Sequence, residues 1–278
     1  MEVIVAKTAG FCFGVKRAVE KVYANVDKEH VYTYGPIIHN EQVVADLEKH
    51  GVKVVEEDTD LTQLPEGTIV VRAHGASRAE FDRLRECGMQ IEDATCPFVS
   101  KIYRIVEEES KAGRTVIIVG NAAHPEVRGI RGWSGEDTYV VGSIEEANNL
   151  NILAKNISIV SQTTFNLKKF KEIVEIFEKK GYDIKCLNTI CNATEVRQTE
   201  ARQIASQVDA MIVIGGKNSS NTQKLFEICK EECSNTYYIQ TAEDLDYTAI
   251  RGMQRIGITA GASTPKNIIE EVQTRCQI

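Results

Sequence analysis

Short runs of β-branched and other apolar residues recur along this 278-residue chain, and most are followed by a stretch with helical periodicity. VIVAKTAGFCFG precedes VKRAVEKVYANV, TIVVRAHGAS precedes RAEFDRLRE, and ISIVSQTTF precedes NLKKFKEIVEIFEKKG. TVIIVGNAAHPE is an exception, because a glycine-rich turn is expected after it. Apolar strands that alternate with amphipathic helices are typical of buried parallel sheets covered by helices. The pattern therefore predicts an α/β fold with mainly parallel sheets.

The runs group into three units that match in register. Each unit begins with a cysteine placed just before a helical stretch: Cys12, Cys96 and Cys191. A polar loop follows each cysteine at nearly the same interval and holds a histidine or a serine: His39, His124 and Ser219. A second polar loop follows further along each unit and holds His74, Thr163 and Ser263. Three features in the same order predict three similar α/β domains, at 1–95, 96–190 and 191–278.

A short strand with acidic residues after it lies between the two loops of each unit, in VKVVEEDTDL, TYVVGSIEEANNL and TYYIQTAEDLDYT. No linker rich in Pro, Gly or Ser separates the units, so we expect them to pack tightly. Functional loops of parallel sheets lie at the carboxyl ends of the strands. If the domains are arranged pseudo-threefold around a central axis, the three cysteines and the six polar loops converge on it.

The net charge limits the partners of such a chain. A formal net charge of -7 at pH 7 argues against the basic surface that nucleic-acid binding needs. No apolar run is long enough to span a membrane, and the N-terminal MEVIVAKTAGFC lacks the features of a signal peptide. We therefore expect a cytoplasmic protein. In that compartment the eight cysteines favour metal ligation, catalysis or core packing over disulfides.

Three thiolates that converge on one point suit a metal centre. Structural zinc sites usually contain local pairs of the C-x2-C type, and the sequence has none. A [4Fe–4S] cluster normally takes four cysteines, so Cys12, Cys96 and Cys191 would leave its fourth iron open to a substrate oxygen. The alternative is that each thiol only packs at a helix start as a small apolar group. The matched positions favour the cluster.

The other five cysteines fit structural roles better. Cys229 and Cys233 lie four residues apart on an expected helix, where a core-facing pair is a simpler interpretation than a metal pair. Cys87 ends an expected helix, and Cys276 has no partner pattern. Cys186 is close in sequence to the third cluster cysteine and stays a candidate fourth ligand.

Polar residues at the expected strand ends form a candidate anion pocket. Three of the five histidines fall in these loops, together with serines and an asparagine: His39, His74, His124, Ser219, Ser220, Asn221 and Ser263. They offer many hydrogen-bond donors and little fixed charge, which suits a phosphate or a diphosphate. KNSSN also leads into a helix, whose N-terminus attracts anions. Simple helix capping is the alternative, and GGKNSS lacks the first glycine of a P-loop.

Glu126, in AHPEV, is the acidic residue placed closest to this set. A carboxyl group in a closed pocket has its pKa raised by desolvation and can relay protons. A position on a surface loop is the alternative. Thr163, in SQTTF, is placed to contact a substrate hydroxyl, and its neighbour Thr164 competes with it for that role.

Nine motifs spread over the whole chain resemble those of one family. The chain contains, in the same order, counterparts of the signatures of the IspH or LytB family of 4-hydroxy-3-methylbut-2-enyl diphosphate reductases: AGFCFGVKRAV, YGPIIHNEQVV, RAHGAS, DATCPFVSK, AHPEV, SQTTF, ICNATEVRQ, GGKNSSNT and TAGASTP. The resemblance implies an iron–sulfur oxidoreductase at the last step of the non-mevalonate (MEP/DOXP) isoprenoid pathway. Its reaction would be the two-electron reductive dehydration of (E)-4-hydroxy-3-methylbut-2-enyl diphosphate to isopentenyl diphosphate and dimethylallyl diphosphate.

The resemblance also implies a role for each candidate residue. Three cysteines would ligate one [4Fe–4S] cluster with an open fourth iron: Cys12, Cys96 and Cys191. Glu126 would donate protons, and Thr163 would contact the hydroxyl end of the substrate. The remaining residues would bind mainly its diphosphate: His39, His74, His124, Ser219, Ser220, Asn221 and Ser263. No G-x-G-x-x-G follows a strand, so electrons are expected from an external ferredoxin or flavodoxin. A monomer or a weak dimer is expected.

Three other functions account for part of the pattern. A redox-neutral [4Fe–4S] dehydratase would use the open iron only as a Lewis acid. A non-catalytic iron–sulfur sensor would explain the cysteines but not the set of histidine, serine and glutamate residues. A metal-free α/β ligand-binding protein would be colourless and free of iron.

Overall fold

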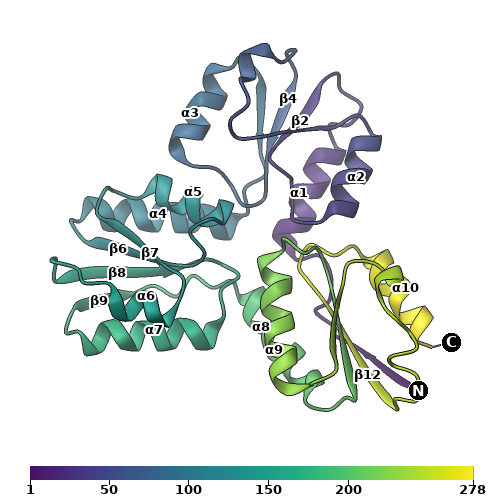
Figure 1. The fold of residues 1–278 in the computed structure, drawn as a ribbon. Helices are drawn as coiled ribbons and strands as arrows, with labels where there is room; N and C mark the ends of the chain where they lie inside the picture. Colours follow the sequence, from purple (N-terminus) through teal and green to yellow (C-terminus); the bar gives the residue numbers. More distant parts are fainter. Residues whose placement is uncertain (278) are drawn as a thin grey trace. The chain divides into compact units, whose positions relative to one another are not determined.

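Three separate four-stranded sheets, with helices beside them, make up the described part of the chain (Figure 1). The computed structural model describes residues 1–277, so residue 278, the last of the expected segment 191–278, lies outside the described residues. All neighbouring strands within the described sheets are parallel. The predicted α/β class with mainly parallel sheets is therefore confirmed.

The middle segment forms a sheet with the strand order β7-β6-β8-β9. Its strands are β6 (Thr115–Val119), β7 (Thr138–Val141), β8 (Asn156–Ser161) and β9 (Asp183–Cys186). Its helices are α4 (Pro97–Lys111), α5 (Pro125–Trp133), α6 (Ile144–Asn149) and α7 (Leu167–Lys179). Alternate residues of β6 face opposite layers: Ile117 packs in the core with α7, and Ile118 packs in the core with α4 and α5. The sheet is thus buried on both faces, which explains the apolar run of its central strand β6.

The preceding segment repeats this order as β3-β2-β4-β5. Its strands are β2 (Val31–Tyr34), β3 (Lys53–Val55), β4 (Thr68–Val71) and β5 (Gln90–Asp93). Its helices are α1 (Phe13–Tyr23), α2 (Glu41–Lys49), the short 3-10 helix η1 (Leu61–Gln63) and α3 (Arg78–Glu86). Phe81 and Leu84 of α3 pack on Tyr34 and Ile69 of the sheet. Short strands with acidic residues after them were expected at β3 and β7, and both form.

The last sheet has the order β11-β10-β12-β1, with the N-terminal strand at its edge. Its strands are β10 (Ala210–Ile214), β11 (Thr236–Ile239), β12 (Arg255–Ala260) and β1 (Glu2–Val5). Its helices are α8 (Asn192–Ala205), α9 (Ser220–Glu232), the 3-10 helix η2 (Ala242–Asp244) and α10 (Lys266–Cys276). Figure 1 shows the purple strand β1 beside the yellow strand β12, and Val3 pairs with Ile256. β1 therefore takes the place that β9 has in the middle sheet.

This exchange changes how the expected segments map onto the sheets. Residues 1–95 contain five strands and supply the first of them to the sheet of residues 191–277. Two compact units result. One contains residues 1–16, 38–46 and the chain from Asn192, with the sheet of β1 and β12. The other contains residues 17–37 and 47–191, with the remaining two sheets.

The prediction of a glycine-rich turn after TVIIVGNAAHPE was wrong, because the glycines there lie in helix α5. Its glycines serve close packing rather than a turn. A Cβ atom at Gly129 would lie 2.5 Å from the Tyr103 hydroxyl, and one at Gly132 would overlap Ser77. Since glycine costs a helix only about 1 kcal/mol relative to alanine, the close contacts outweigh its low propensity.

The helices of the described residues differ from membrane-spanning helices in length and hydropathy. None of the helices within residues 1–277 has the length and apolar character needed to cross a bilayer.

Candidate active site

The first polar loop of each repeat begins with the same backbone hydrogen bond. The glycine after the first strand donates its N–H to the carbonyl of the last residue of the neighbouring strand: Gly35 to Val55, Gly120 to Val141 and Gly215 to Ile239, at 2.8, 2.9 and 2.9 Å. His39, His124 and Ser219 each lie four residues after these glycines. The equivalence of the three positions, expected from their spacing, therefore has a structural counterpart.

The second polar loop of each repeat carries a carbonyl that binds the N–H of a cluster-candidate cysteine. Ala73, Thr163 and Ala262 accept from Cys96, Cys191 and Cys12, at 3.0, 3.0 and 3.2 Å respectively. Each acceptor lies two residues beyond the end of its strand. The expected match therefore shifts by one residue, and Thr164, rather than Thr163, is the equivalent of His74 and Ser263. The intervals from the cysteines differ too much for the sequence to fix this register.

The three candidate ligand cysteines share their surroundings. None of the three forms a disulfide, all are half-buried, and each lies directly before a helix: Cys12 before α1, Cys96 before α4 and Cys191 before α8. The unsatisfied N–H groups of a helix start stabilise negative charge, as on a thiolate ligand. Three accessible soft donors of this kind fit an iron–sulfur cluster.

The other cysteines have different surroundings. Cys229, Cys233 and Cys276 are buried in the core, and burial raises the pKa of the Cys229 thiol to about 12. Cys87 is the C-cap residue of α3, and its thiol donates to the Leu84 carbonyl. Cys186 is exposed at the end of the edge strand β9.

Glu126 lies in the first turn of α5, with only 2% of its surface exposed. Thr163 holds its carboxyl group twice: the backbone N–H lies 2.6 Å from Oε1, and the hydroxyl lies 2.8 Å from Oε2. Burial raises the pKa of Glu126 from its ordinary value of 4.5 to about 7, although the bonds from Thr163 lower it. Glu126 therefore carries its proton in a large share of molecules near neutral pH, as a proton donor must.

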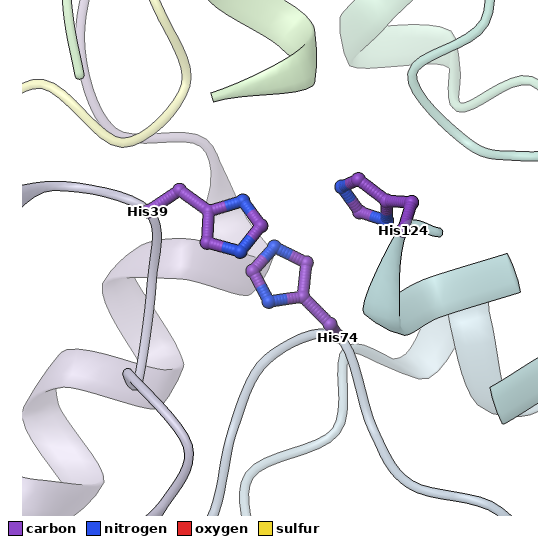
Figure 2. A group of neighbouring side chains, drawn as sticks. All are labelled: His39, His74 and His124. Atoms are coloured by element: carbon purple, nitrogen blue, oxygen red, sulfur yellow. The ribbon is translucent and has the colours of Figure 1, made fainter. Parts of the chain in front are cut away.

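His124 begins helix α5 and is tied to Glu126. The N–H of Glu126 donates to Nδ1 of His124 at 3.1 Å, so the proton of a neutral His124 ring sits on Nε2. The rings of His74 and His124 meet edge to face, with their centroids 5.3 Å apart (Figure 2). The structure thus brings together four residues that the sequence singled out in this unit: His74, His124, Glu126 and Thr163.

The other compact unit assembles the remaining candidates. The Ser263 hydroxyl donates to the carbonyl of His39 at 3.1 Å. Gly216 also lies against this carbonyl, since a Cβ atom there would be 2.6 Å from it. Ser219 caps α9 and accepts from the Thr222 N–H at 3.3 Å. The loops that hold His39, Ser219 and Ser263 are therefore in contact.

Asn221 lies in the first turn of α9 and is 95% buried, since only 5% of its surface is exposed. Its side-chain NH2 group has no hydrogen-bond partner within residues 1–277. Ser220 is the first residue of the same helix. A buried donor at a helix N-terminus is suited to an anionic ligand.

Gln162 is a residue of this site that the sequence interpretation missed. It directly follows β8 and is almost fully buried. Its Oε1 accepts from the N–H of Asn121 at 3.2 Å, and its Nε2 donates to the Thr164 hydroxyl at 3.0 Å. Its position directly after a buried strand, shared with Arg72 after β4, was the signal that would have revealed it.

A buried carboxyl group with a raised pKa, placed at strand ends beside imidazole rings, is typical of an enzyme that transfers protons to a bound substrate. The comparisons with known proteins specify this class. A family model described as LytB protein matches residues 3–277. The chain belongs to the LytB family.

Two curated relatives are named 4-hydroxy-3-methylbut-2-enyl diphosphate reductase. The protein of Caldanaerobacter subterraneus subsp. tengcongensis is 48% identical to this chain, and the match covers 98% of this chain and 95% of that protein. The protein of Geobacter sulfurreducens is 47% identical, and the match covers 100% of this chain and 97% of that protein.

Two solved structures carry the same activity in their descriptions. The E-1-hydroxy-2-methyl-but-2-enyl-4-diphosphate reductase of Plasmodium falciparum matches with a TM-score of 0.93 at 29% identity, over 99% of this chain and 87% of that one. An (E)-4-hydroxy-3-methyl-but-2-enyl diphosphate reductase, described as the terminal enzyme of the non-mevalonate pathway, matches with a TM-score of 0.70 at 42% identity, over 100% and 99%. The expected family and the expected enzyme class, a reductase, are confirmed.

Proposed function

We propose that this chain reduces (E)-4-hydroxy-3-methylbut-2-enyl diphosphate to isopentenyl diphosphate and dimethylallyl diphosphate, at the last step of the non-mevalonate pathway. The reaction adds two electrons and two protons, breaks the carbon–oxygen bond of the allylic alcohol and releases water. The observation that carries the proposal is the buried Glu126, whose raised pKa and paired hydrogen bonds suit a proton donor. The names of the relatives support the choice of substrate.

The cofactor in this proposal is one [4Fe–4S] cluster. The LytB family is iron–sulfur dependent, and this chain offers three half-buried thiols at helix starts, none of them in a disulfide: Cys12, Cys96 and Cys191. When bound, such a cluster supplies electrons and, through an iron without a protein ligand, a Lewis acid. The carbonyls of Ala262, Ala73 and Thr163 would hold the N–H groups of these cysteines in place.

The diphosphate would be held by neutral donors rather than by fixed cations. Ser219, Ser220 and Asn221 stand at the N-terminus of α9, where backbone N–H groups and the helix dipole favour an anion. His39, His74, His124 and Ser263 complete the set. Binding energy from the diphosphate would fix the position of the reacting carbon and so support the chemical step.

Glu126 would donate the proton that releases the hydroxyl group as water. Thr163 would orient the carboxyl group, because its hydroxyl and its N–H each bind one carboxyl oxygen. Thr163 would also contact the substrate hydroxyl. Burial of Glu126 excludes water from the acid, which keeps its proton for the substrate.

The wider setting follows the sequence-based expectations. The segments 1–95, 96–190 and 191–278 would act as three domains around the cluster, with β1 exchanged between the first and the last. Electrons would come from an external ferredoxin or flavodoxin, and the enzyme would be a cytoplasmic monomer or weak dimer.

Turnover assays with anaerobically reconstituted protein test the proposal. We expect isopentenyl and dimethylallyl diphosphate to form only with a reductant, either dithionite or reduced flavodoxin. Product formation without any electron source would instead identify a redox-neutral dehydratase. Failure of iron-loaded protein to convert the substrate under either condition would rule out the proposed reaction.

A further inference from the structure

We infer that Arg72, Glu57 and Arg128 form a positioning network that holds the loop of His74 against helix α5, the helix of His124 and Glu126. The inference deepens the proposed function and rests on it. The three residues act through the residues they hold, so they are positioning residues rather than catalytic ones.

Arg72 ties together the loops at the strand ends of its own sheet. It directly follows β4 and precedes His74 by two residues, and only 4% of its surface is exposed. Its Nε donates to the Gly75 carbonyl at 3.3 Å. Its guanidinium also fills the space beside Gly35, where a Cβ atom would overlap it. The buried cation therefore fixes both sides of the His74 loop.

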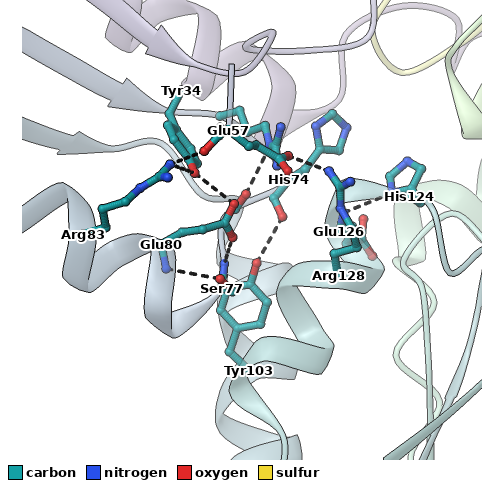
Figure 3. A network of polar contacts seen from close by, with 12 residues as sticks. Tyr34, Glu57, His74, Ser77, Glu80, Arg83, Tyr103, His124, Glu126 and Arg128 are labelled. Carbon is teal, nitrogen blue, oxygen red and sulfur yellow. Dashed lines mark hydrogen bonds and ion pairs between the residues drawn. The ribbon is translucent and has the colours of Figure 1, made fainter. Parts of the chain in front are cut away.

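Glu57 extends this arrangement to helix α5. It lies in the loop after β3, and its Oε1 accepts from Nη2 of Arg72 at 2.5 Å and from Nη2 of Arg128 at 2.5 Å (Figure 3). Arg128 lies one turn after His124, and its backbone N–H donates to the His124 carbonyl at 3.0 Å. One carboxylate thus joins the arginine before His74 to the arginine after His124.

A second contact holds the same loop from the other side. The hydroxyl of Tyr103, in α4, donates to the His74 carbonyl at 3.1 Å (Figure 3). The Tyr103 ring stacks on Trp133 at the end of α5. Two sets of contacts therefore hold the His74 loop beside the His124 ring. One is the chain of Arg72, Glu57 and Arg128, and the other is the contact of Tyr103 with His74 and Trp133. Loss of either set would leave the His74 ring less well placed.

The equivalent position in the middle sheet shows what the charge of Arg72 adds. Gln162 follows β8 as Arg72 follows β4, and it also packs against a strand-end glycine, Gly120. Its neutral side chain bonds to Asn121 and to Thr164, as described above. A neutral side chain is therefore sufficient to join neighbouring loops. The guanidinium instead requires a counter-charge when buried, and Glu57 provides it while also reaching α5.

Arg128→Ala is the cleanest test, because the side chain of Arg128 is 49% exposed and its loss leaves the Arg72–Glu57 pair intact. In reconstituted holoenzyme, we expect KM for the substrate to rise about fivefold, with kcat changed by less than about twofold, because substrate binding is lost uniformly. Cluster content and Tm should stay near the wild-type values, because exposed ion pairs contribute little stability. Arg131→Ala is the matched control, since Arg131 is an exposed arginine of the same helix.

A double-mutant cycle separates the network from a merely structural ion pair. Glu57→Gln should raise KM further and lower Tm, because Arg72 loses its counter-charge. Adding Arg128→Ala to Glu57→Gln should change KM little, since both act through one link. Arg128→Lys, which keeps the charge, should restore part of the loss. Additive effects on KM, or a lower Tm of Arg128→Ala with unchanged KM, would overturn the inference.

NMR of the histidine rings tests the network without turnover. Arg128→Ala should shift the ring signals of His74 and His124, whereas Arg131→Ala should not. If wild-type holoenzyme proved inactive, the proposed reaction would fail, and the ring signals would still decide on the network. Unchanged signals in Arg128→Ala would refute it.

Discussion

Thr163 holds both carboxyl oxygens of Glu126, with its N–H 2.6 Å from Oε1 and its hydroxyl 2.8 Å from Oε2. The carbonyl of the same threonine accepts from the N–H of Cys191 at 3.0 Å. One residue therefore links the proposed proton donor to a proposed cluster ligand. Because both bonds favour the ionised carboxylate, Thr163 also opposes the effect of burial on the pKa of Glu126.

Replacing the acid tests its role most directly. Glu126→Gln keeps the size of the side chain but removes its ionisable proton. We expect reductase activity to fall by at least about 100-fold, the usual contribution of a general acid, while iron content stays unchanged. Glu136→Gln, at an exposed position, is the control and should keep full activity. Full activity of cluster-loaded Glu126→Gln would contradict the assignment.

The raised pKa of Glu126 predicts how activity depends on pH. A general acid must be protonated, so kcat/KM should fall as pH rises through about 7, the pKa of Glu126. The residual activity of Glu126→Gln should lack this decline. Initial rates with saturating reductant, measured between about pH 6 and pH 9, provide the check. A wild-type profile that stays level across this range would show that another group supplies the proton.

The same pKa predicts how stability depends on pH. Between pH 4.5, the ordinary pKa, and pH 7, the folded state binds more protons at Glu126 than the unfolded state does. The stability from protonated Glu126 is thus fully present below pH 4.5 and is lost as pH rises through about 7. The loss approaches about 3 kcal/mol. Urea unfolding of cluster-free protein should show the wild type losing stability relative to Glu126→Gln over this range, and a constant difference would contradict the prediction.

The fold was predictable where burial alone decides local structure. β4, β6, β8, β10 and β12 are rich in buried β-branched residues because both faces of each sheet are covered. The edge strands β5 and β9 read QIED and DIKC, and their charged, partly exposed residues gave no such signal. The pairing of β1 with β12 joins residues about 250 positions apart, which no local pattern reveals.

The hydroxyl of Thr163 should tune the acid. Thr163→Val keeps the shape but removes the hydroxyl, so the pKa of Glu126 should rise, by about one unit for one hydrogen bond to a charged group. The decline of kcat/KM should then move to higher pH. Thr163→Ser keeps the bond and should leave the profile unchanged. A shift in Thr164→Val instead would assign the role to the neighbouring threonine.

The residue types of the candidate site were predictable from the sequence, but the hydrogen bonds and ion pairs between them were not. Histidine, serine and glutamate at strand ends follow from parallel topology, because those ends form one edge. The register between Thr163 and Thr164 needed the backbone hydrogen bonds to the cysteines. The pair of Glu57 and Arg72 was missed, because a charged side chain in sequence is usually solvated.

The side-chain NH2 group of Asn221, which has no hydrogen-bond partner within residues 1–277, predicts a donor to the diphosphate. Asn221→Asp is isosteric and replaces the buried NH2 donor with a carboxylate oxygen, which repels an anion. KM for the substrate should rise at least about tenfold, because a like charge in a buried site costs more than about 1.4 kcal/mol. Asn151→Asp makes the same charge change at an exposed position and should leave KM unchanged. Competitive inhibition by inorganic pyrophosphate should weaken in parallel, and unaltered inhibition would place the diphosphate elsewhere.

Single cysteine replacements test the ligand set. Cys12→Ser, Cys96→Ser and Cys191→Ser should each lower iron content and visible absorbance after anaerobic reconstitution, because each removes one of three soft donors. Cys186→Ser is the decisive control, since this exposed thiol lies near Cys191 in sequence. It should retain the cluster, and Mössbauer spectra should show one iron whose signal changes when the substrate is added. If Cys186→Ser lost the cluster instead, four cysteines would hold it, and no iron would stay open for the substrate hydroxyl. Glu126 would then act on a substrate held by the diphosphate site alone.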